Sequence, residues 1–205
     1  MTSSQQLQTQ AHTCPVWIGY LLASPLRRLF ENPNDMILPL VKAGDRVMEL
    51  GPGLGFFTCP LAQALGNNGE IVCVDVQASM LARLAKRLEK RGLSARVQLR
   101  QCRFDDLGLT GDANAFDLVL ALHVVHETAR PTETIQALAD CIKPGGKLLL
   151  VEPSGHCPND LWLQEIAAAK ACGLHRVAHP RLDSKKQLAL WSKAALQPVV
   201  LPAES

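Results

Sequence analysis

An acidic residue and a glycine-rich turn carry the clearest chemistry in this sequence. Glu49 ends a short apolar run, and the turn that follows contains Gly51, Pro52, Gly53 and Gly55. Glycine lets a backbone approach a ligand where a Cβ atom would block it. A helix expected from about residue 57 directs free N–H groups and the positive end of its dipole to the same spot. The stretch therefore predicts a ligand that presents an anionic group to the turn and a cationic group to Glu49.

A second acidic residue follows the next apolar run. Asp75 lies twenty residues beyond Gly55, near the end of the apolar stretch 69–76. A carboxylate accepts hydrogen bonds through two oxygens, and a ribose offers two adjacent hydroxyl donors. We therefore predict that Asp75 binds a ribose, and Val76 and Met80 would then flank the base attached to that ribose. The alternative is that Asp75 only caps the helix that follows it.

Three further residues are candidates for acid–base chemistry. His126 and Glu127 follow the apolar run 116–122, and Glu152 follows the run 147–151. Histidine titrates near neutral pH and serves as a general base, so His126, Glu127 and Glu152 are candidate catalytic residues. The alternative is a local role, in which His126 hydrogen-bonds nearby and Glu127 caps a helix. No recognised metal-ligand spacing is present, and we expect no metal site.

The elements that must position these residues alternate between strands and helices. Strands are predicted at 47–50, 69–76, 97–102, 116–122 and 147–151. Helices are predicted at 34–41, 79–91, 132–142 and 158–172, and a turn is predicted at 143–146. Two final strands at 174–182 and 186–192 lie too close for a crossover helix and predict an antiparallel hairpin. The expected fold is α/β, a doubly wound, mostly parallel seven-stranded sheet with helices on both faces and an antiparallel C-terminal hairpin.

Composition limits the classes of partner. The 205 residues are 47% hydrophobic and 20% charged, with a net charge of +2, which predicts one globular domain without a strong electrostatic pull toward nucleic acid or membrane. A basic run at 83–103 is interpreted as a solvated helix face plus an edge strand. Seven cysteines without a C-x-x-C pair, a polar N-terminus and no apolar run near the ~20 residues of a membrane span favour a cytoplasmic protein.

The N-terminal part has a different character from the rest. We expect residues 1–34 to form a helical segment and residues 35–205 to form the ligand-binding domain. Trp17, Tyr20 and Phe30 gather in the first segment. Such a segment either packs on the core or acts as a lid over the active site.

The glycine turn resembles a known motif. Glu49-Leu50-Gly51-Pro52-Gly53-Leu54-Gly55 resembles the first motif of the class I (Rossmann-like) S-adenosylmethionine-dependent methyltransferases, and Asp75 matches their second motif. The dinucleotide pattern G-x-G-x-x-G requires a glycine at Phe56, which disfavours a dehydrogenase. The methionine part of S-adenosylmethionine carries both an ammonium and a carboxylate. The resemblance covers about residues 35–200 and implies S-adenosylmethionine as the cofactor and S-adenosylhomocysteine as the product.

The resemblance also assigns residues that spacing alone does not. Relatives often place an acidic residue after the third strand to touch the adenine amino group. Cys102 stands there in this sequence, so backbone groups at Cys102 and Arg103 are the expected substitutes. After the fourth strand, the backbone of Ala121, Leu122 and His123 is expected to touch the cofactor.

The function implied is methyl transfer to a small-molecule acceptor, without a nucleic-acid or membrane partner. No large substrate domain separates the fifth strand from the final hairpin, so acceptor recognition is expected from residues 1–40 and the loops after strands four and five. The alternative is a methyltransferase-like module that binds the cofactor without catalysis and serves regulation or assembly.

Overall fold

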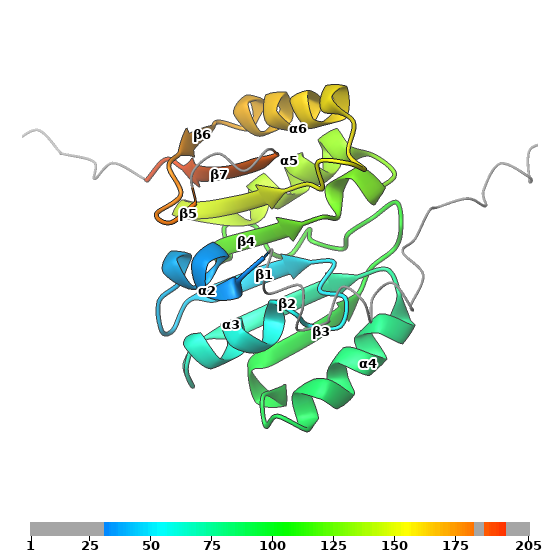
Figure 1. Ribbon diagram of the computed structural model, residues 1–205, viewed down its shortest axis with the longest axis vertical. Coiled ribbons are helices and arrows are strands. Elements are labelled where there is room, and N and C mark those ends of the chain that lie inside the picture. The colour runs from blue at the N-terminus through cyan, green and yellow to red at the C-terminus, as the bar shows by residue number, and fades with distance from the viewer. Residues whose placement is uncertain (1–30, 183–186, 196–205) are drawn as a thin grey trace, which may run out of the picture.

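The computed structural model describes residues 31–182 and 187–195, in which seven strands form one sheet (Figure 1). The strands are β1 (Arg46–Leu50), β2 (Glu70–Asp75), β3 (Val97–Gln101), β4 (Phe116–Leu122), β5 (Ile142–Val151), β6 (Leu174–Val177) and β7 (Leu188–Lys193). Their order is β3-β2-β1-β4-β5-β7-β6. Strands β1 to β5 pair in parallel, and β7 runs antiparallel to both β5 and β6. The predicted sheet and its C-terminal hairpin are confirmed.

The central strands are buried on both faces. In β1 every residue after Arg46 is buried, and β2 and β4 are nearly as enclosed. Continuous apolar runs are typical of parallel strands that are covered on both sides. The strand order reverses between β1 and β4, and ligands bind outside the carboxyl ends of strands at such a point.

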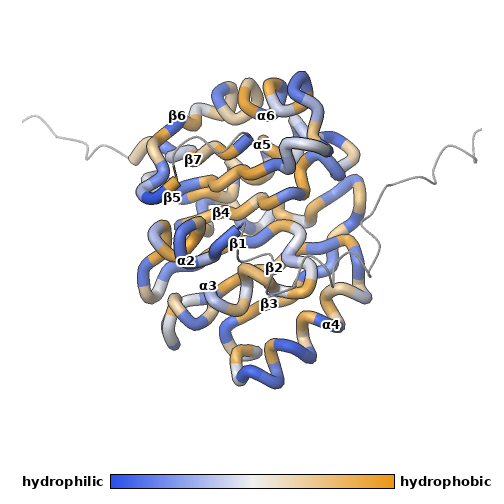
Figure 2. Tube along the Cα trace, viewed as in Figure 1, coloured by the Kyte–Doolittle hydropathy of each residue, from blue (hydrophilic) through white to orange (hydrophobic). Residues whose placement is uncertain are grey.

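Helices cover both faces of the sheet. The helices and 3₁₀ turns are α2 (Pro33–Met36), η2 (Leu38–Leu40), α3 (Thr58–Ala64), α4 (Ala78–Glu89), η3 (Ser94–Arg96), η4 (Val125–Glu127), α5 (Pro131–Cys141) and α6 (Asn159–Ala171). Residues of α2, α3 and α4 form one apolar cluster with the sheet, and residues of α5 and α6 form a second cluster on the other face. Figure 2 shows the resulting pattern, with hydrophobic strands through the centre and hydrophilic stretches around them.

Four predicted elements differ from the structure. The helix predicted at 34–41 is a single α-turn followed by η2, because Pro39 lacks the N–H that a continuing helix needs. The turn predicted at 143–146 lies within β5, where the pairing with β4 jumps from Ile142 to Lys147. The strand predicted at 174–182 ends at Val177, and that predicted at 186–192 is β7 at 188–193. Trp17, Tyr20 and Phe30 lie outside the described residues.

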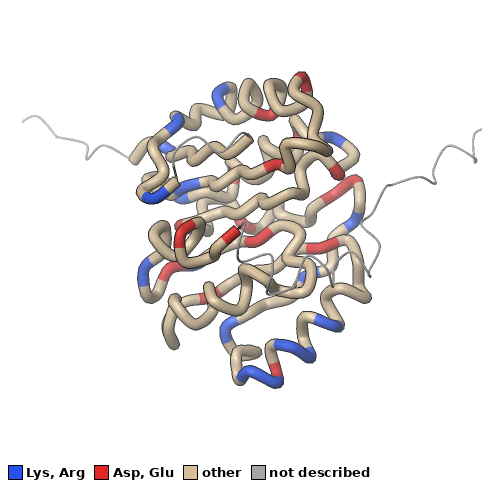
Figure 3. The backbone as a smooth tube through the Cα atoms, viewed as in Figure 1, with Lys and Arg blue, Asp and Glu red and all other residues tan. Residues whose placement is uncertain are grey.

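The basic run at 83–103 has the arrangement predicted for it. Helix α4 buries Leu84 and Leu88 and exposes Lys86 and Lys90, and β3 is the strand at one edge of the sheet. Figure 3 shows the Lys and Arg residues along α4. Within the described ranges, no helix is long and apolar enough to cross a membrane.

Truncation of a side chain at the buried centre of the sheet should lower the free energy of unfolding most. Leu120 is fully buried in β4, between β1 and β5, and Leu120→Ala should lower the free energy of unfolding by about 2–5 kcal/mol, because it removes apolar contacts and leaves a cavity. Leu163→Ala is the matched control, since Leu163 is 64% exposed and surface changes usually stay within about 0.5 kcal/mol. Urea unfolding of both variants measures the difference, and equal losses would contradict the assignment of Leu120 to the core.

Candidate cofactor site and active site

The glycine turn after β1 adopts a backbone conformation that glycine favours. Gly51, Gly53 and Gly55 have φ angles of 65°, 54° and 77°, in the left-handed region that other residues rarely adopt. A Cβ on Gly51 would lie 2.7 Å from Val124 Cγ2, and a Cβ on Gly55 would lie 2.5 Å from Leu84 Cδ1. A Cβ on Gly53 would meet no atom within 4 Å. The outer glycines therefore pack against the protein, while Gly53 faces open space where a ligand can approach.

Glu49 is buried at the end of β1, with 2% of the residue exposed. Its Oε2 accepts a hydrogen bond from Thr58 Oγ1 at 2.6 Å and a longer one from Cys73 Sγ at 3.8 Å. These bonds tie the carboxylate to the first turn of α3 and to β2. Thr58 is a partner that the sequence analysis did not identify. The contact of Glu49 with a cationic group stays a prediction.

Asp75 stands at the end of β2 and is 8% exposed. Its Oδ1 accepts a hydrogen bond from the backbone N–H of Gln77 at 2.8 Å. Gln77 is the N-cap residue of α4 and the helix has no side-chain cap, so this bond is a local turn rather than the helix cap weighed as an alternative. Burial raises the pKa of Asp75, and the backbone N–H groups of Gln77, Gly53 and Val76 partly offset that rise. A buried carboxylate with a raised pKa gains from additional hydrogen-bond donors, and two ribose hydroxyls are donors of that kind.

The side predicted for adenine lies between α4 and the end of β3. Met80 is buried, and Val76 and Cys102 are half-buried. The N–H of Cys102 already donates to the carbonyl of Asp75 at 3.0 Å, and the N–H of Arg103 donates to the carbonyl of Asp106 at 2.9 Å. These two N–H groups are therefore already paired, and the contact of the Cys102 and Arg103 backbone with the adenine stays a prediction.

The side chains on the adenine side add little charge. The exposed guanidinium of Arg103 pairs with Asp105, with Nε 3.1 Å from Oδ1. Burial raises the pKa of the Cys102 thiol to about 11, which keeps it neutral. A half-buried neutral thiol is a surface suited to an aromatic base rather than to a charged group.

The loop after β4 packs directly against the glycine turn. Ala121 and Leu122 are buried, and His123 has a φ of 59° with its N–H donating to the carbonyl of Val151 at 2.7 Å. The bend at His123 precedes Val124, whose side chain closes over Gly51. His123 Nε2 lies 2.5 Å from Glu31 Oε1, a contact across 92 residues that no local pattern indicates.

His126 pairs with Glu152 rather than with its neighbour Glu127. His126 Nδ1 lies 2.5 Å from Glu152 Oε2, whereas His126 Nε2 lies 4.0 Å from Glu127 Oε1. Glu152 Oε1 also accepts the backbone N–H of Val125 at 2.9 Å and that of His126 at 3.3 Å. The Glu152 side chain is fully buried. The segments that follow β4 and β5 therefore supply the hydrogen-bonded pair, and the catalytic roles of His126, Glu127 and Glu152 stay predictions.

The electrostatics of this pair favour a charged imidazole. Burial lowers the pKa of His126, but the hydrogen bond and the negative charge of Glu152, with help from Glu127 and Glu165, outweigh burial and raise it overall. Burial also raises the pKa of Glu127. Because Nδ1 faces an acceptor, the neutral ring carries its proton there and keeps its lone pair on Nε2. This is the arrangement that a general base requires.

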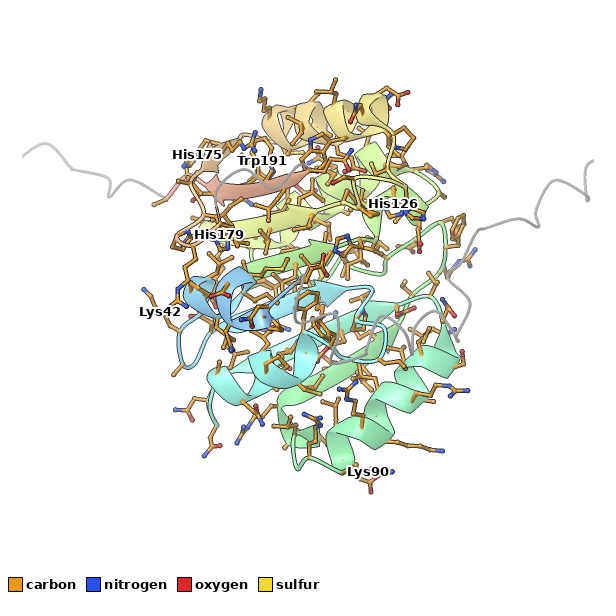
Figure 4. All side chains as sticks on the ribbon, in the orientation of Figure 1. Lys42, Lys90, His126, His175, His179 and Trp191 are labelled. Atoms are coloured by element: carbon orange, nitrogen blue, oxygen red, sulfur yellow. The ribbon has the colours of Figure 1, made fainter. Side chains whose placement is uncertain are left out.

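Two other histidines lie away from this site. Figure 4 shows His126 at the end of the sheet where α6 begins, whereas His175 and His179 lie at the opposite end. In the part of the chain that the structure describes, no group of three or more His, Cys, Asp or Glu side chains is arranged to hold a metal ion. The six cysteines in that part are free.

One buried charged residue, Glu165, was not among the predicted site residues. Glu165 is 1% exposed and lies on the face of α6 that also buries Ala168 and Ala169. The spacing of Glu165 with Ala168 and Ala169 indicates its burial, because positions three and four residues apart share one face of a helix. A glutamate in register with two buried alanines is therefore predicted to point inward.

Known proteins are similar in sequence to parts of this chain. Residues 48–148 match a family described as a methyltransferase domain. The ubiquinone/menaquinone biosynthesis C-methyltransferase UbiE of Pseudomonas paraeruginosa is 31% identical over 132 residues, which cover 64% of this chain and 50% of that protein. The protein of the same description from Azotobacter vinelandii is 29% identical over 132 residues, covering 64% and 51%. The chain thus spans about half the length of the curated relatives it matches.

A solved structure agrees with the fold. A S-adenosylmethionine-dependent methyltransferase from Aquifex aeolicus superimposes with a TM-score of 0.71 and 19% identity, over 88% of this chain and 98% of that one. The glycine turn after β1 and Asp75 at the end of β2 lie within the matched residues 48–148. Residues 48–148 are therefore assigned to a methyltransferase domain, and the chain has the fold of an S-adenosylmethionine-dependent methyltransferase.

Proposed function

We propose that this chain transfers a methyl group from S-adenosylmethionine to a small-molecule acceptor, with His126 as the general base. The observation that carries the proposal is the His126–Glu152 pair and its connection to the glycine turn. Val124 packs on Gly51, and the N–H of the next residue, Val125, donates to Glu152. A continuous set of contacts thus joins the turn proposed to hold the cofactor to the residue proposed to accept a proton.

The residues around the turn fit the cofactor that the family implies. Gly53 leaves space for close backbone approach, and the Asp75 carboxylate supports this fit because it gains from hydroxyl donors. When bound, S-adenosylmethionine supplies an electrophilic methyl group. We propose that the cofactor is held by residues at the ends of β1, β2, β3 and β4, namely Glu49, Gly51, Pro52, Gly53, Gly55, Asp75, Val76, Met80, Cys102, Arg103, Ala121, Leu122 and His123.

His126, Glu152 and Glu127 are proposed to act on the acceptor side. Glu152 fixes the ring of His126 and stabilises the imidazolium that forms when Nε2 takes a proton. Glu127, with an exposed side chain 4.0 Å from Nε2, adds negative charge on the open side of the ring. The two curated relatives are named as C-methyltransferases. An acceptor carbon activated by loss of a proton is the class that such a base serves.

The surroundings of the protein are also part of the proposal. Free cysteines and the modest net charge support a reducing, cytoplasmic setting without a nucleic-acid partner. The non-catalytic alternative differs in one measurable respect, because such a module binds S-adenosylmethionine but methylates no acceptor.

The ribose assignment predicts a loss of affinity on truncation of Asp75. Asp75→Ala should weaken S-adenosylhomocysteine binding by at least ~1.5 kcal/mol, more than tenfold, because a carboxylate makes strong hydrogen bonds. Asp75→Asn keeps one acceptor oxygen and should lose less affinity than Asp75→Ala. Titration calorimetry measures both, with Asp140→Ala as the control because its carboxylate is exposed on α5.

The same residue predicts a pH dependence of binding. The carboxylate of Asp75 must be ionised to accept from both hydroxyls, so affinity should fall as the pH drops through its raised pKa. Full affinity of Asp75→Ala would refute the ribose assignment. Loss of folding in that variant, measured by circular dichroism, would mean that its bond to Gln77 is its main role.

If His126 is the general base, its removal should lower the turnover rate but leave the affinity for the cofactor unchanged. His126→Ala should lower turnover roughly 10²–10⁴-fold, because a positioned general base accelerates a reaction by about that factor. The affinity for S-adenosylhomocysteine should stay at the parent value. Glu152→Gln should also slow turnover, since the amide no longer holds a proton on Nδ1 and stabilises the imidazolium less. Turnover of the parent protein should fall as the pH drops through the raised pKa of His126.

A matched histidine provides the control for that experiment. His175 is exposed in β6, at the far end of the sheet from His126 (Figure 4), and His175→Ala should leave turnover unchanged. Parent-level turnover by His126→Ala would remove the residue from the mechanism. Cofactor binding by the parent protein without methylation of any acceptor in a small-molecule panel would favour the non-catalytic module.

A further inference from the structure

His123 holds a backbone conformation that a side chain of its kind rarely adopts. Its φ of 59° lies in the left-handed region that favours glycine. A backbone held in this way persists only where its surroundings fix it, and such positions gather at functional sites. His123 directly follows β4, at the carboxyl edge of the sheet where the cofactor is proposed to bind. The contacts that hold this bend are therefore candidates for a role in the site.

Contacts from two distant parts of the chain fix His123. Its N–H donates to the carbonyl of Val151 at 2.7 Å, and its Nε2 lies 2.5 Å from Glu31 Oε1. The side chains of His123 and Glu31 are only 21% and 19% exposed, so water and salt screen their contact only in part. His123 Nδ1 is buried and has no hydrogen-bond partner among the described residues. Because Nε2 faces the carboxylate, the neutral ring carries its proton on Nε2 and donates it to Glu31.

Glu31 can hold the ring because the segment that follows it is itself attached to the core. Asn32 caps α2 with its side chain. Met36, at the end of α2, is 1% exposed, and its carbonyl accepts a hydrogen bond from His179 Nε2 at 2.8 Å. The backbone of Glu31 is thus tied to the core through one capped and buried helical turn.

The bend at His123 sets the place of Val124 on the glycine turn. Val124 has a φ of −140°, and its Cγ2 lies 2.7 Å from the position that a Cβ on Gly51 would occupy. The next residue, Val125, is fixed by its N–H bond to Glu152. A change of φ at His123 would move Val124 relative to Gly51, because rotation at one residue displaces the residue that follows it.

We propose that Glu31 is a positioning residue for the cofactor site. It holds the ring of His123 and so keeps the backbone bend at that residue. The bend in turn seats Val124 on Gly51, so a residue that precedes β1 contributes to cofactor affinity without touching the cofactor. The last step, from the glycine turn to the cofactor, rests on the proposed function. The first step, from Glu31 to the loop after β4, is measurable without a ligand.

Hydrogen exchange on the full chain without ligand tests the first step. The amide of His123 is protected by its bond to Val151, so Glu31→Ala should speed its exchange, and Glu31→Gln, which keeps an acceptor oxygen, should speed it less. Asp35→Ala is the matched control, because Asp35 is an acidic residue of α2 that pairs with Arg181 at 3.4 Å. Unchanged exchange in Glu31→Ala, or an equal increase in Asp35→Ala, would overturn the proposal.

Titration calorimetry with S-adenosylhomocysteine tests the second step. Glu31→Ala should weaken binding roughly tenfold, about the effect of one charged hydrogen bond, whereas Asp35→Ala should keep the parent affinity. His123→Gly should keep more affinity than His123→Ala, because glycine adopts a positive φ freely and alanine does not. Adding Glu31→Ala to His123→Gly should cost no further affinity, since the ring that Glu31 holds is then gone.

The outcomes separate this inference from the proposed function. Parent-level affinity in Glu31→Ala, or a further loss when that change is added to His123→Gly, would overturn the positioning role. If circular dichroism shows that a His123 variant does not fold, exchange and affinity of the two Glu31 variants decide. A parent protein that binds no S-adenosylhomocysteine would refute the proposed function and the last step, while faster exchange in Glu31→Ala would still support the first.

Discussion

The burial of the parallel strands on both faces is the constraint on which the rest of this structure depends. A strand covered by helices on both sides tolerates polar side chains only where it ends. Glu49 is the next-to-last residue of β1, Asp75 is the last residue of β2, and Glu152 directly follows β5. Because those ends lie at one edge of the sheet (Figure 1), the hydrophobic core itself gathers the acidic residues that build the site.

Each of these carboxylates also holds a neighbouring segment in place. Glu49 binds Thr58 at the start of α3, Asp75 binds the N–H of Gln77 before α4, and Glu152 binds the loop that contains Val125. A buried charge is tolerated when hydrogen bonds satisfy it. The residues proposed for ligand binding and catalysis are therefore part of the framework. Glu165 differs from them, because neither of its buried oxygens has a partner among the described residues, and burial and the charge of Glu152 raise its pKa to about 8.

Local sequence patterns determined most of the fold. The apolar runs that became β1, β2, β4 and the second half of β5 are uninterrupted enough to specify buried strands, and the spacing around Leu84 and Leu88 specified α4. The errors arose where one residue or pairing partner overrides a pattern. Pro39 ended the helix expected at 34–41. The strand after Leu174 lasted only as long as β7 lay beside it, because an edge strand needs a paired neighbour.

The sequence by itself determined the glycine turn and the acidic residues after β1 and β2, because their conformation and neighbours depend on adjacent residues. Only the tertiary structure decided which glutamate pairs with His126. Adjacent residues on a helical turn do not face each other, so Glu127 lies 4.0 Å away, whereas the parallel ends of β4 and β5 bring in Glu152 from 26 residues along the chain. The contact of His123 with Glu31 has the same origin, because distant segments meet only after the sheet has assembled.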